Sequence, residues 1–284
     1  MVGNWRLNQY NLQSLMKKIL TELVVTMVVI FAVWLGLSQL DWMKLFNIRQ
    51  NTQNTEEKIG DLFWKMLKNT ETEITSDSIV APFDSILTRI CSANSIDRKK
   101  IKLHLLRKDE INAFALPGNH LVVLSGLIAA CENEAELYGV IGHELAHMEK
   151  NHVMNKLVKE VGLSVLISMS TGNGNSEAIK SAIRKISSST YDRKLETEAD
   201  LTAVDYLEKT GINPEPFASF LYRLADQTKN LPSQIYWISS HPESKERAEK
   251  IIEQIKGNDF PKAEAKDSLR FERLKAKIKE RLDE

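Results

Sequence analysis

The alternation of apolar and polar positions divides the chain into stretches of different character, and the first is an apolar run. Residues 23–40 contain no charged side chain, and this length matches the hydrocarbon core of a bilayer. Because no small-residue cleavage site follows the run, the pattern favours an uncleaved anchor over a secretory signal peptide. A buried core helix is the alternative, although such a helix normally carries a polar stripe. We therefore expect a transmembrane anchor at residues 23–40, after an N-terminal tail of residues 1–22.

Basic residues on the two sides of this run bear on its orientation. Both flanks carry positive charges, so the distribution is nearly even: Arg6, Lys17 and Lys18 before the run, and Lys44, Arg49 and Lys58 after it. The adjacent pair Lys17 and Lys18 favours a cytoplasmic N-terminus. We therefore expect a single-pass membrane protein whose main domain lies on the extracytoplasmic, periplasmic side.

The rest of the chain shows mainly helical periodicity. Residues 41–78 carry apolar side chains at helical spacing and predict a stalk or a first packing helix. Between residues 100 and 124, short apolar runs separated by the turn-forming segments RKDE and PGN predict a small antiparallel sheet. Helical periodicity then continues to a charged C-terminal helix at residues 261–284. These patterns predict an α+β domain, mainly helical, at residues 79–260.

The amino-acid composition argues against several classes of function. The 284 residues include 38 Lys and Arg against 38 Asp and Glu, and this zero net charge argues against a nucleic-acid-binding protein. Hydrophobic residues make up 43% of the chain, which is typical of a globular protein. Cys91 and Cys131 lack the CxxC spacing of a zinc ribbon or a redox motif. One disulfide is consistent with them, but two buried thiols are favoured.

The candidate chemistry lies in a helix predicted to begin at Asn133 and to read ELYGVIGHELAHMEKNHV. This helix contains the HExxH pattern, with His143 and His147 at positions i and i+4. Residues at this spacing lie on the same face of a helix, so both imidazoles can bind one metal ion. Glu144 projects about 100° round the helix axis, from where it can reach a water bound to the metal. Two surface or capping histidines are the alternative interpretation.

A catalytic zinc site needs a third protein ligand, and a second helix supplies candidates. Residues 191–200 read YDRKLETEAD and place Glu196 and Asp200 one helical turn apart. Glu196 can complete a His, His, Glu ligand set, and Asp200 can accept a hydrogen bond from a ligand imidazole. An acidic pair alone is usually a solvated helix face. Its position downstream of HExxH is what favours a role at the metal.

The order of the motifs resembles one family, the zinc metallopeptidases that group the Ste-type CAAX prenyl protease with HtpX-like, Oma-type and BepA-like proteases, which share HExxH plus ExxxD and are minigluzincin-like. The resemblance covers about residues 100–252 and rests on four motifs: NAFALPGNHLVVLSGLI at 112–128, HELAH at 143–147, YDRKLETEAD at 191–200 and SSHPESKER at 239–247. Asn119 stands where many members have a second glycine, and Asp192 where a serine is frequent. Neither position is an expected metal ligand.

The resemblance implies a zincin-like fold with the HELAH helix in the core beside the sheet. It implies one Zn²⁺ per chain, bound by His143, His147 and Glu196. Glu144 would be the general base, and Asp200 would hold a ligand imidazole by a hydrogen bond.

The resemblance also makes His241 an active-site histidine. We expect it either to donate to the oxyanion during turnover or to occupy the metal in a latent state. A histidine that only caps or packs the last helices is the alternative. The remaining histidines have no such support and are interpreted as surface or packing residues: His104, His120 and His152.

The strand formed by Asn112, Ala113, Phe114 and Ala115 resembles the edge on which the family docks substrate. There an extended peptide would add as a further strand through main-chain hydrogen bonds. Without the resemblance, an ordinary core strand is an equally good interpretation of these residues.

Together these features predict a membrane-anchored zinc metalloendopeptidase that hydrolyses peptide bonds in protein or peptide substrates, with membrane or envelope protein quality control as the role that the family suggests. Zinc would polarise the scissile carbonyl and acidify its bound water, and Glu144 would pass the proton to the leaving amine. One alternative is an HExxH hydrolase that acts on another kind of bond. A second is a membrane-tethered, zinc-containing chaperone-like or binding module with little proteolytic activity. A structural zinc normally has four protein ligands, whereas the motifs supply three plus a general base, which favours the protease.

Overall fold

The computed structural model describes residues 20–28, 31, 48–172, 174–188, 190–227, 237, 240–242, 244–260 and 265–283. The chain divides into two compact units, Met1–Gln53 and Asn54–Glu284. The strands that the structure describes and the residues of the candidate site belong to the second unit, whose described residues are mainly helical.

The expected anchor at residues 23–40 lies largely outside the described residues. Residues 20–28 and Phe31 are helical, and the side chains of Leu23 and Val25 are more than half exposed. Within the described part of the chain, no helix combines the length and the apolar character needed to cross a membrane. A transmembrane anchor therefore stays a prediction.

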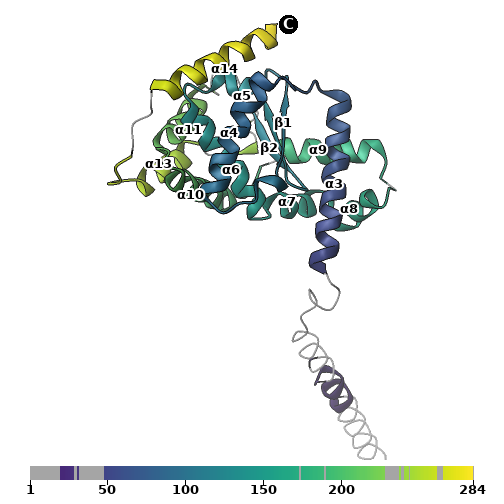
Figure 1. Cartoon of the computed structure of the whole chain (residues 1–284). Helices are drawn as coiled ribbons and strands as arrows, with labels where there is room; N and C mark the ends of the chain where they lie inside the picture. Colours follow the sequence, from purple (N-terminus) through teal and green to yellow (C-terminus); the bar gives the residue numbers. More distant parts are fainter. Residues whose placement is uncertain are drawn as a thin grey trace, which may run out of the picture. The chain divides into compact units, whose positions relative to one another are not determined.

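The helices of the second unit surround a small sheet (Figure 1). Two helices and a short 3-10 turn precede the strands: α3 (Ile48–Thr70), α4 (Asp77–Ala93) and η1 (Arg98–Lys100). The helices that follow the strands are α5 (Ser125–Ala130), α6 (Glu134–Glu149), α7 (His152–Val161), α8 (Leu163–Ser170), α9 (Ser176–Ser188), α10 (Arg193–Thr210), α11 (Glu215–Gln227), α13 (Ser244–Gln254) and α14 (Ala265–Asp283).

The sheet has three strands in the order β1-β3-β2: β1 (Lys102–Leu106), β2 (Ala113–Leu116) and β3 (His120–Leu124). β2 and β3 form an antiparallel hairpin in which Leu116 faces His120. β1 instead pairs with β3 in parallel, with Lys102 opposite His120. The prediction of an antiparallel sheet was therefore wrong for β1, and the sheet is mixed.

Gly126, just after β3, lies against the connection that follows β1. Its backbone N–H donates to the carbonyl of Lys108 at 2.8 Å, and a Cβ built on it would lie 2.6 Å from the backbone of Asp109 and Glu110. The connection after β1 therefore passes over the end of β3 and delivers β2 to the far side of that strand. Apolar runs and turn residues predict how many strands there are, but they do not predict this crossing.

The turn of the β2–β3 hairpin explains why Asn119 can stand where many family members have a second glycine. Gly118 and Asn119 have φ angles of 67° and 61°, both in the left-handed region. Among residues other than glycine, asparagine is one of the few that adopts this region readily. Asn119 can therefore replace a second glycine without disturbing the turn.

Apolar side chains of β3 pack on both sides of the sheet, because successive residues of a strand point to opposite sides. Leu121 and Val123 of β3 belong to a core cluster that includes side chains from α4, α6, α10, α11, α13 and α14. Val122 and Leu124 belong to a second cluster with side chains from α3, α7, α8 and α9. The sheet is thus buried between two layers of helices, which is why every residue of β3 is buried.

The two helices at the ends of this unit are packing helices. Ile59 and Phe63 of α3 are fully buried in the second cluster. In α14, Phe271, Leu274 and Ile278 are buried in the first cluster, while the charged residues between them face outward. The amphipathic spacing that the sequence shows in both segments is therefore used for packing.

Candidate metal centre

The helix that carries HExxH is buried along most of its length. α6 begins at Asn133, whose side chain accepts a hydrogen bond from the backbone N–H of Glu136 at 3.0 Å, as predicted. The carboxylate of Glu136 accepts the N–H of Glu132 at 2.9 Å, so the start of the helix is capped from two sides. Further along, a Cβ on Gly139 would lie 2.4 Å from the Phe217 side chain. This glycine lets α11 pack directly against the backbone of α6.

The second helix with candidate ligands is α10. Asp192, where the family often has serine, is the N-cap of this helix. The Asp192 carboxylate accepts the N–H of Lys194 at 2.9 Å, a role that aspartate fills as well as the serine that is frequent in the family. Ala199 is completely buried on this helix, between Glu196 and Asp200. α10 as a whole packs against α6.

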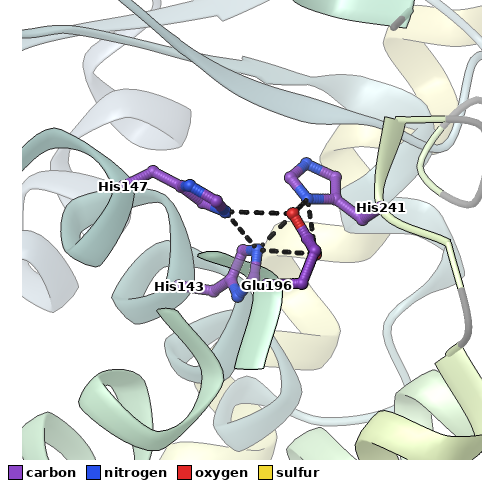
Figure 2. Close-up of side chains that lie close together, drawn as sticks. All are labelled: His143, His147, Glu196 and His241. Atoms are coloured by element: carbon purple, nitrogen blue, oxygen red, sulfur yellow. Dashed lines mark hydrogen bonds and ion pairs between the residues drawn. The ribbon is translucent and has the colours of Figure 1, made fainter. Parts of the chain in front are cut away.

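Four donor side chains converge in the core. His143 and His147 of α6, Glu196 of α10 and His241 each offer one ligand atom, and these atoms all lie within 4.8 Å of one another. Figure 2 shows the side chains pointing toward a common centre. None of the four is more than 1% exposed.

The donor atoms lie close enough together to share one metal ion, although their separations are unequal and extend to 3.7 Å between Nε2 of His143 and Oε2 of Glu196. Nε2 of His143 lies 3.0 Å from Nε2 of His147 and 3.2 Å from Nδ1 of His241. Oε1 of Glu196 lies 3.3 Å from Nε2 of His147 and 2.9 Å from Nδ1 of His241. Tetrahedral ligands at zinc distances of about 2.0–2.1 Å are separated by about 3.3–3.4 Å. The residue types and the closeness of their donor atoms therefore suit a zinc ion.

The protonation states of the metal-free site also suit a cation. Burial lowers the pKa of His147 to about 3 and that of His241 to about 4, so both imidazoles are neutral at pH 7. Burial alone would raise the pKa of Glu196, but His241 and Arg247 together hold it well below its ordinary value. Neutral imidazoles and an ionised carboxylate are the forms that bind zinc.

Glu144 has a different environment from Glu196. Burial and the negative charge of Glu196 raise the pKa of Glu144 well above its ordinary value. Its Oε2 accepts the backbone N–H of Ala115 at 3.0 Å. Its Oε1 is buried, lies 3.4 Å from Nε2 of His241, and has no hydrogen-bond partner in the described part of the chain. One carboxylate oxygen is therefore held by the sheet, and the other is free for a proton.

Asp200 lies beside His143, the expected metal ligand. Its Oδ1 is 2.9 Å from Nδ1 of His143, so the other ring nitrogen of that imidazole faces the donor cluster. This arrangement selects the tautomer that a metal ligand requires.

Arg247 of α13 was missed by the sequence analysis. It is 3% exposed and donates to both carboxylate oxygens of Asp200, at 2.7 Å each. It also lies 2.8 Å from Oε2 of Glu196 and donates to the carbonyl of His241 at 3.2 Å. SSHPESKER contains this residue, but an arginine in a polar motif is indistinguishable from a solvated one until its acidic partners are known to be buried.

The segment of His241 is held by aromatic contacts. The His241 ring stacks on Trp237 with centroids 4.2 Å apart, and its backbone N–H donates to the Trp237 carbonyl at 2.7 Å. Tyr191, which begins the YDRKLETEAD segment, stacks on His147 at 4.1 Å. The backbone N–H of Tyr191 donates to the carbonyl of Ser240 at 3.3 Å. These contacts join the third and fourth motifs around the donor cluster.

The expected substrate strand is at the edge of the sheet. β2 is an outer strand, and the N–H of Ala115 points away from β3 toward Glu144. Ala113, Phe114 and Ala115 are buried, and Asn112 Nδ2 lies 3.5 Å from the carbonyl of Ser187 at the end of α9. The structure thus places this edge beside the HExxH helix.

The remaining histidines divide into two groups. His104 and His120 lie on the sheet, 2.9 Å apart through Nε2 and Nδ1, and do not approach the donor cluster. His152, by contrast, contacts the expected ligand His147, with the two Nδ1 atoms 3.0 Å apart. Nothing in the local sequence pattern indicates this contact of His152. Cys91 and Cys131 are free, buried thiols.

Comparisons with known proteins agree with this geometry. Residues 82–255 match the model of peptidase family M48. The beta-barrel assembly-enhancing protease of Yersinia pestis is 27% identical over 202 residues, which cover 66% of this chain and 41% of that protein. The mitochondrial metalloendopeptidase OMA1 of Schizosaccharomyces pombe is 26% identical over 60% of this chain and 51% of its own length. The metalloprotease LoiP of Escherichia coli is 28% identical over 64% of this chain and 76% of its own length.

The matched region therefore spans about two fifths of the Yersinia relative's length and half of the yeast one's. The family match itself covers more than half of the present chain and includes all four donor residues and Glu144. The chain belongs to peptidase family M48, a family of metallopeptidases.

Proposed function

We propose that this protein is a zinc-dependent metalloendopeptidase that cleaves protein substrates at the centre formed by His143, His147 and Glu196. The observation that carries the proposal is the convergence of these buried donors, whose ligand atoms lie within 4.8 Å of one another, with the carboxylate of Glu144 near them. Names of the relatives support the reaction class, because they include proteases and a metalloendopeptidase.

The bound zinc and Glu144 would have different roles in the reaction. When zinc is bound, it supplies a Lewis acid for the scissile carbonyl and acidifies a water molecule. Glu144 takes the proton of the attacking water on Oε1 and delivers it to the leaving amine. Its Oε1 suits this exchange, because this oxygen has no hydrogen-bond partner in the described part of the chain.

We propose that the substrate lies along the outer edge of β2. An extended peptide there would continue the sheet through main-chain hydrogen bonds and would bring a carbonyl next to Glu144. The contact of Asn112 with Ser187 lies at this same edge. Binding of a peptide along Asn112, Ala113, Phe114 and Ala115 would therefore break the contact between Asn112 and Ser187.

We further propose that His241 is a latch. Its Nδ1 lies in the fourth corner of the donor set, 3.2 Å from the His143 ligand atom and 2.9 Å from that of Glu196. In that position it competes with the water that hydrolysis requires. Withdrawal of His241 would open the fourth position and activate the enzyme.

The cellular setting is also a proposal. We propose that residues 23–40 anchor the enzyme in a membrane, with residues 1–22 in the cytoplasm, and that it acts in membrane or envelope protein quality control. The apolar run and the names of the relatives, which are beta-barrel assembly-enhancing proteases, support this. Protease added to intact spheroplasts should digest the main domain, whereas protection until lysis would place it on the cytoplasmic side.

The activity is tested with the full chain in detergent, by casein hydrolysis per bound zinc. Wild type should cleave casein and lose that activity with a chelator. Glu144→Gln should keep zinc and the fold but lose hydrolysis, because only proton transfer is removed. Glu177→Gln, a change in an exposed ion pair of α9, is the matched control and should behave as wild type. Hydrolysis near the wild-type rate in Glu144→Gln would remove the proposed base.

A second candidate follows from the fourth donor. Because His241 brings the number of protein donors to four, the site also resembles a closed structural zinc, as in a binding or chaperone-like module. Under that function, zinc-loaded wild type and Glu144→Gln would both fail to cleave casein. The His241→Ala variant separates the two, since a latched protease gains activity and a structural site loses zinc.

A further inference from the structure

His147 has a neighbour on the side of its ring that faces away from the donor cluster. α6 ends at Glu149, and Asn151 adopts a left-handed conformation with φ 56° that reverses the chain. The next residue, His152, starts α7 and comes back against the helix that it has just left. Its side chain is 2% exposed, and its Nδ1 lies 3.0 Å from Nδ1 of His147.

The direction of this hydrogen bond follows from the metal site. Nε2 of His147 faces the donor cluster and must be unprotonated to bind a metal, so the proton of its neutral ring is on Nδ1. That Nδ1–H then donates, and Nδ1 of His152 must accept. The proton of a neutral His152 is therefore on Nε2, which lies 3.5 Å from Oε2 of Glu198.

Glu198, the partner of His152, lies at the protein surface. Its side chain is 47% exposed and lies 3.2 Å from the ammonium of Lys150, in the turn between α6 and α7. Both nitrogens of the buried His152 ring are thus directed at polar partners, one at the metal site and one at the carboxylate. A histidine that only fills space would not need both contacts.

The two histidines of HExxH consequently have different supports. His143 is backed by Asp200, an ionised carboxylate that is itself held by Arg247. His147 is backed by a neutral imidazole that leads to an exposed carboxylate. Hydrogen bonds of this kind orient metal-binding imidazoles and fix their tautomer.

We propose that His152 is a positioning residue for the metal: it accepts the Nδ1 proton of His147 and so holds that ring with Nε2 toward the ion, while Glu198 orients His152 in turn. This inference rests on the proposed zinc function of the site. It assigns a role to a residue that lies outside HExxH and outside the four donors.

The test measures zinc affinity in the full chain by competition with a chromogenic chelator. His152→Ala removes the acceptor and should weaken zinc binding by about 10- to 100-fold, the usual effect of losing such a partner. His152→Asn places an amide oxygen near the position of Nδ1 and should restore affinity to within about threefold of wild type. Glu198→Ala should cause a smaller loss than His152→Ala, because this side chain is half exposed. Glu177→Ala, in an exposed carboxylate–lysine pair on α9, is the matched control and should change nothing.

A second readout does not depend on affinity. In the cobalt-loaded protein, the visible spectrum reports the geometry of the ligands, so His152→Ala should shift the absorption bands and His152→Asn should return them. Equal zinc affinity in wild type and His152→Ala, or equal loss in His152→Ala and His152→Asn, would overturn the inference. Failure of wild type to bind zinc would instead overturn the proposed function, and the inference with it.

Discussion

Replacing Arg247 with methionine removes the positive charge that two buried carboxylates share. Arg247 makes two charged hydrogen bonds to Asp200 at 2.7 Å and lies 2.8 Å from Glu196, and all three side chains are at most 3% exposed. Removing one partner of a buried ion pair costs about 3–5 kcal/mol, because the remaining charge is left without compensation. Methionine keeps much of the apolar stem, so the loss measures the charge rather than the packing.

Metal binding should affect the two carboxylates differently. In the zinc-loaded protein, the ion itself would compensate Glu196, whereas Asp200 would still lose its partner. We therefore expect the destabilisation to be larger in the metal-free protein than in the zinc-loaded one. At about 2–4 °C per kcal/mol for a domain of this size, the metal-free variant should melt about 6–20 °C below wild type.

The assay is thermal unfolding by circular dichroism, with and without zinc, on the full chain. Lys180→Met is the matched control, because Lys180 is 45% exposed and pairs with Glu177, which is 71% exposed, on α9. An exposed pair of this kind contributes at most about 1 kcal/mol. Melting of metal-free Arg247→Met within about 2 °C of wild type would refute the view that Arg247 neutralises these carboxylates.

Three further predictions follow from the structure. Asp200→Asn should weaken zinc binding by about 10- to 100-fold in chelator competition, because the partner of His143 loses its charge, and unchanged affinity would show that the contact is unimportant. His241→Ala should raise casein hydrolysis per bound zinc if His241 is a latch; a fall of about 100-fold would instead assign it to the oxyanion. Burial lowers the pKa of His120 to about 4, so the unfolded chain, with an ordinary histidine pKa of about 6.5, binds the proton more readily. Its contribution to stability is complete above about pH 6.5 and is lost progressively between there and about pH 4, so the melting temperature should fall less between pH 7 and pH 5 in His120→Gln than in wild type.

Local sequence rules predicted the parts of the site that lie on one helix. The i, i+4 spacing of His143 and His147 needs only helical geometry, and the same holds for Glu196 and Asp200. Pairing these two helices required the order of the motifs, since spacing within one segment does not say which other segment lies opposite. The cap at Asn133 was also predictable, because it depends on residues three positions apart.

Features that depend on where the chain turns and which elements then pack together could not be predicted from the local sequence pattern. His152 reaches His147 only because Asn151 turns the chain, and nothing in the local pattern distinguishes that turn from a longer connection. Arg247 looks like a solvated residue in sequence, and its buried position is decided by α13 packing beside α10. The parallel pairing of β1 has the same origin, because it depends on the connection that follows β1, which lies against Gly126, rather than on the strands themselves.

The zinc content of the full chain, measured by mass spectrometry of the metal in wild type and in Glu196→Ala, tests the central claim most directly. Because three protein ligands hold a catalytic zinc, wild type should contain about one zinc per chain and the variant should lose it. Wild type without zinc, or a Glu196→Ala variant that retains a full equivalent, would contradict the account of this centre.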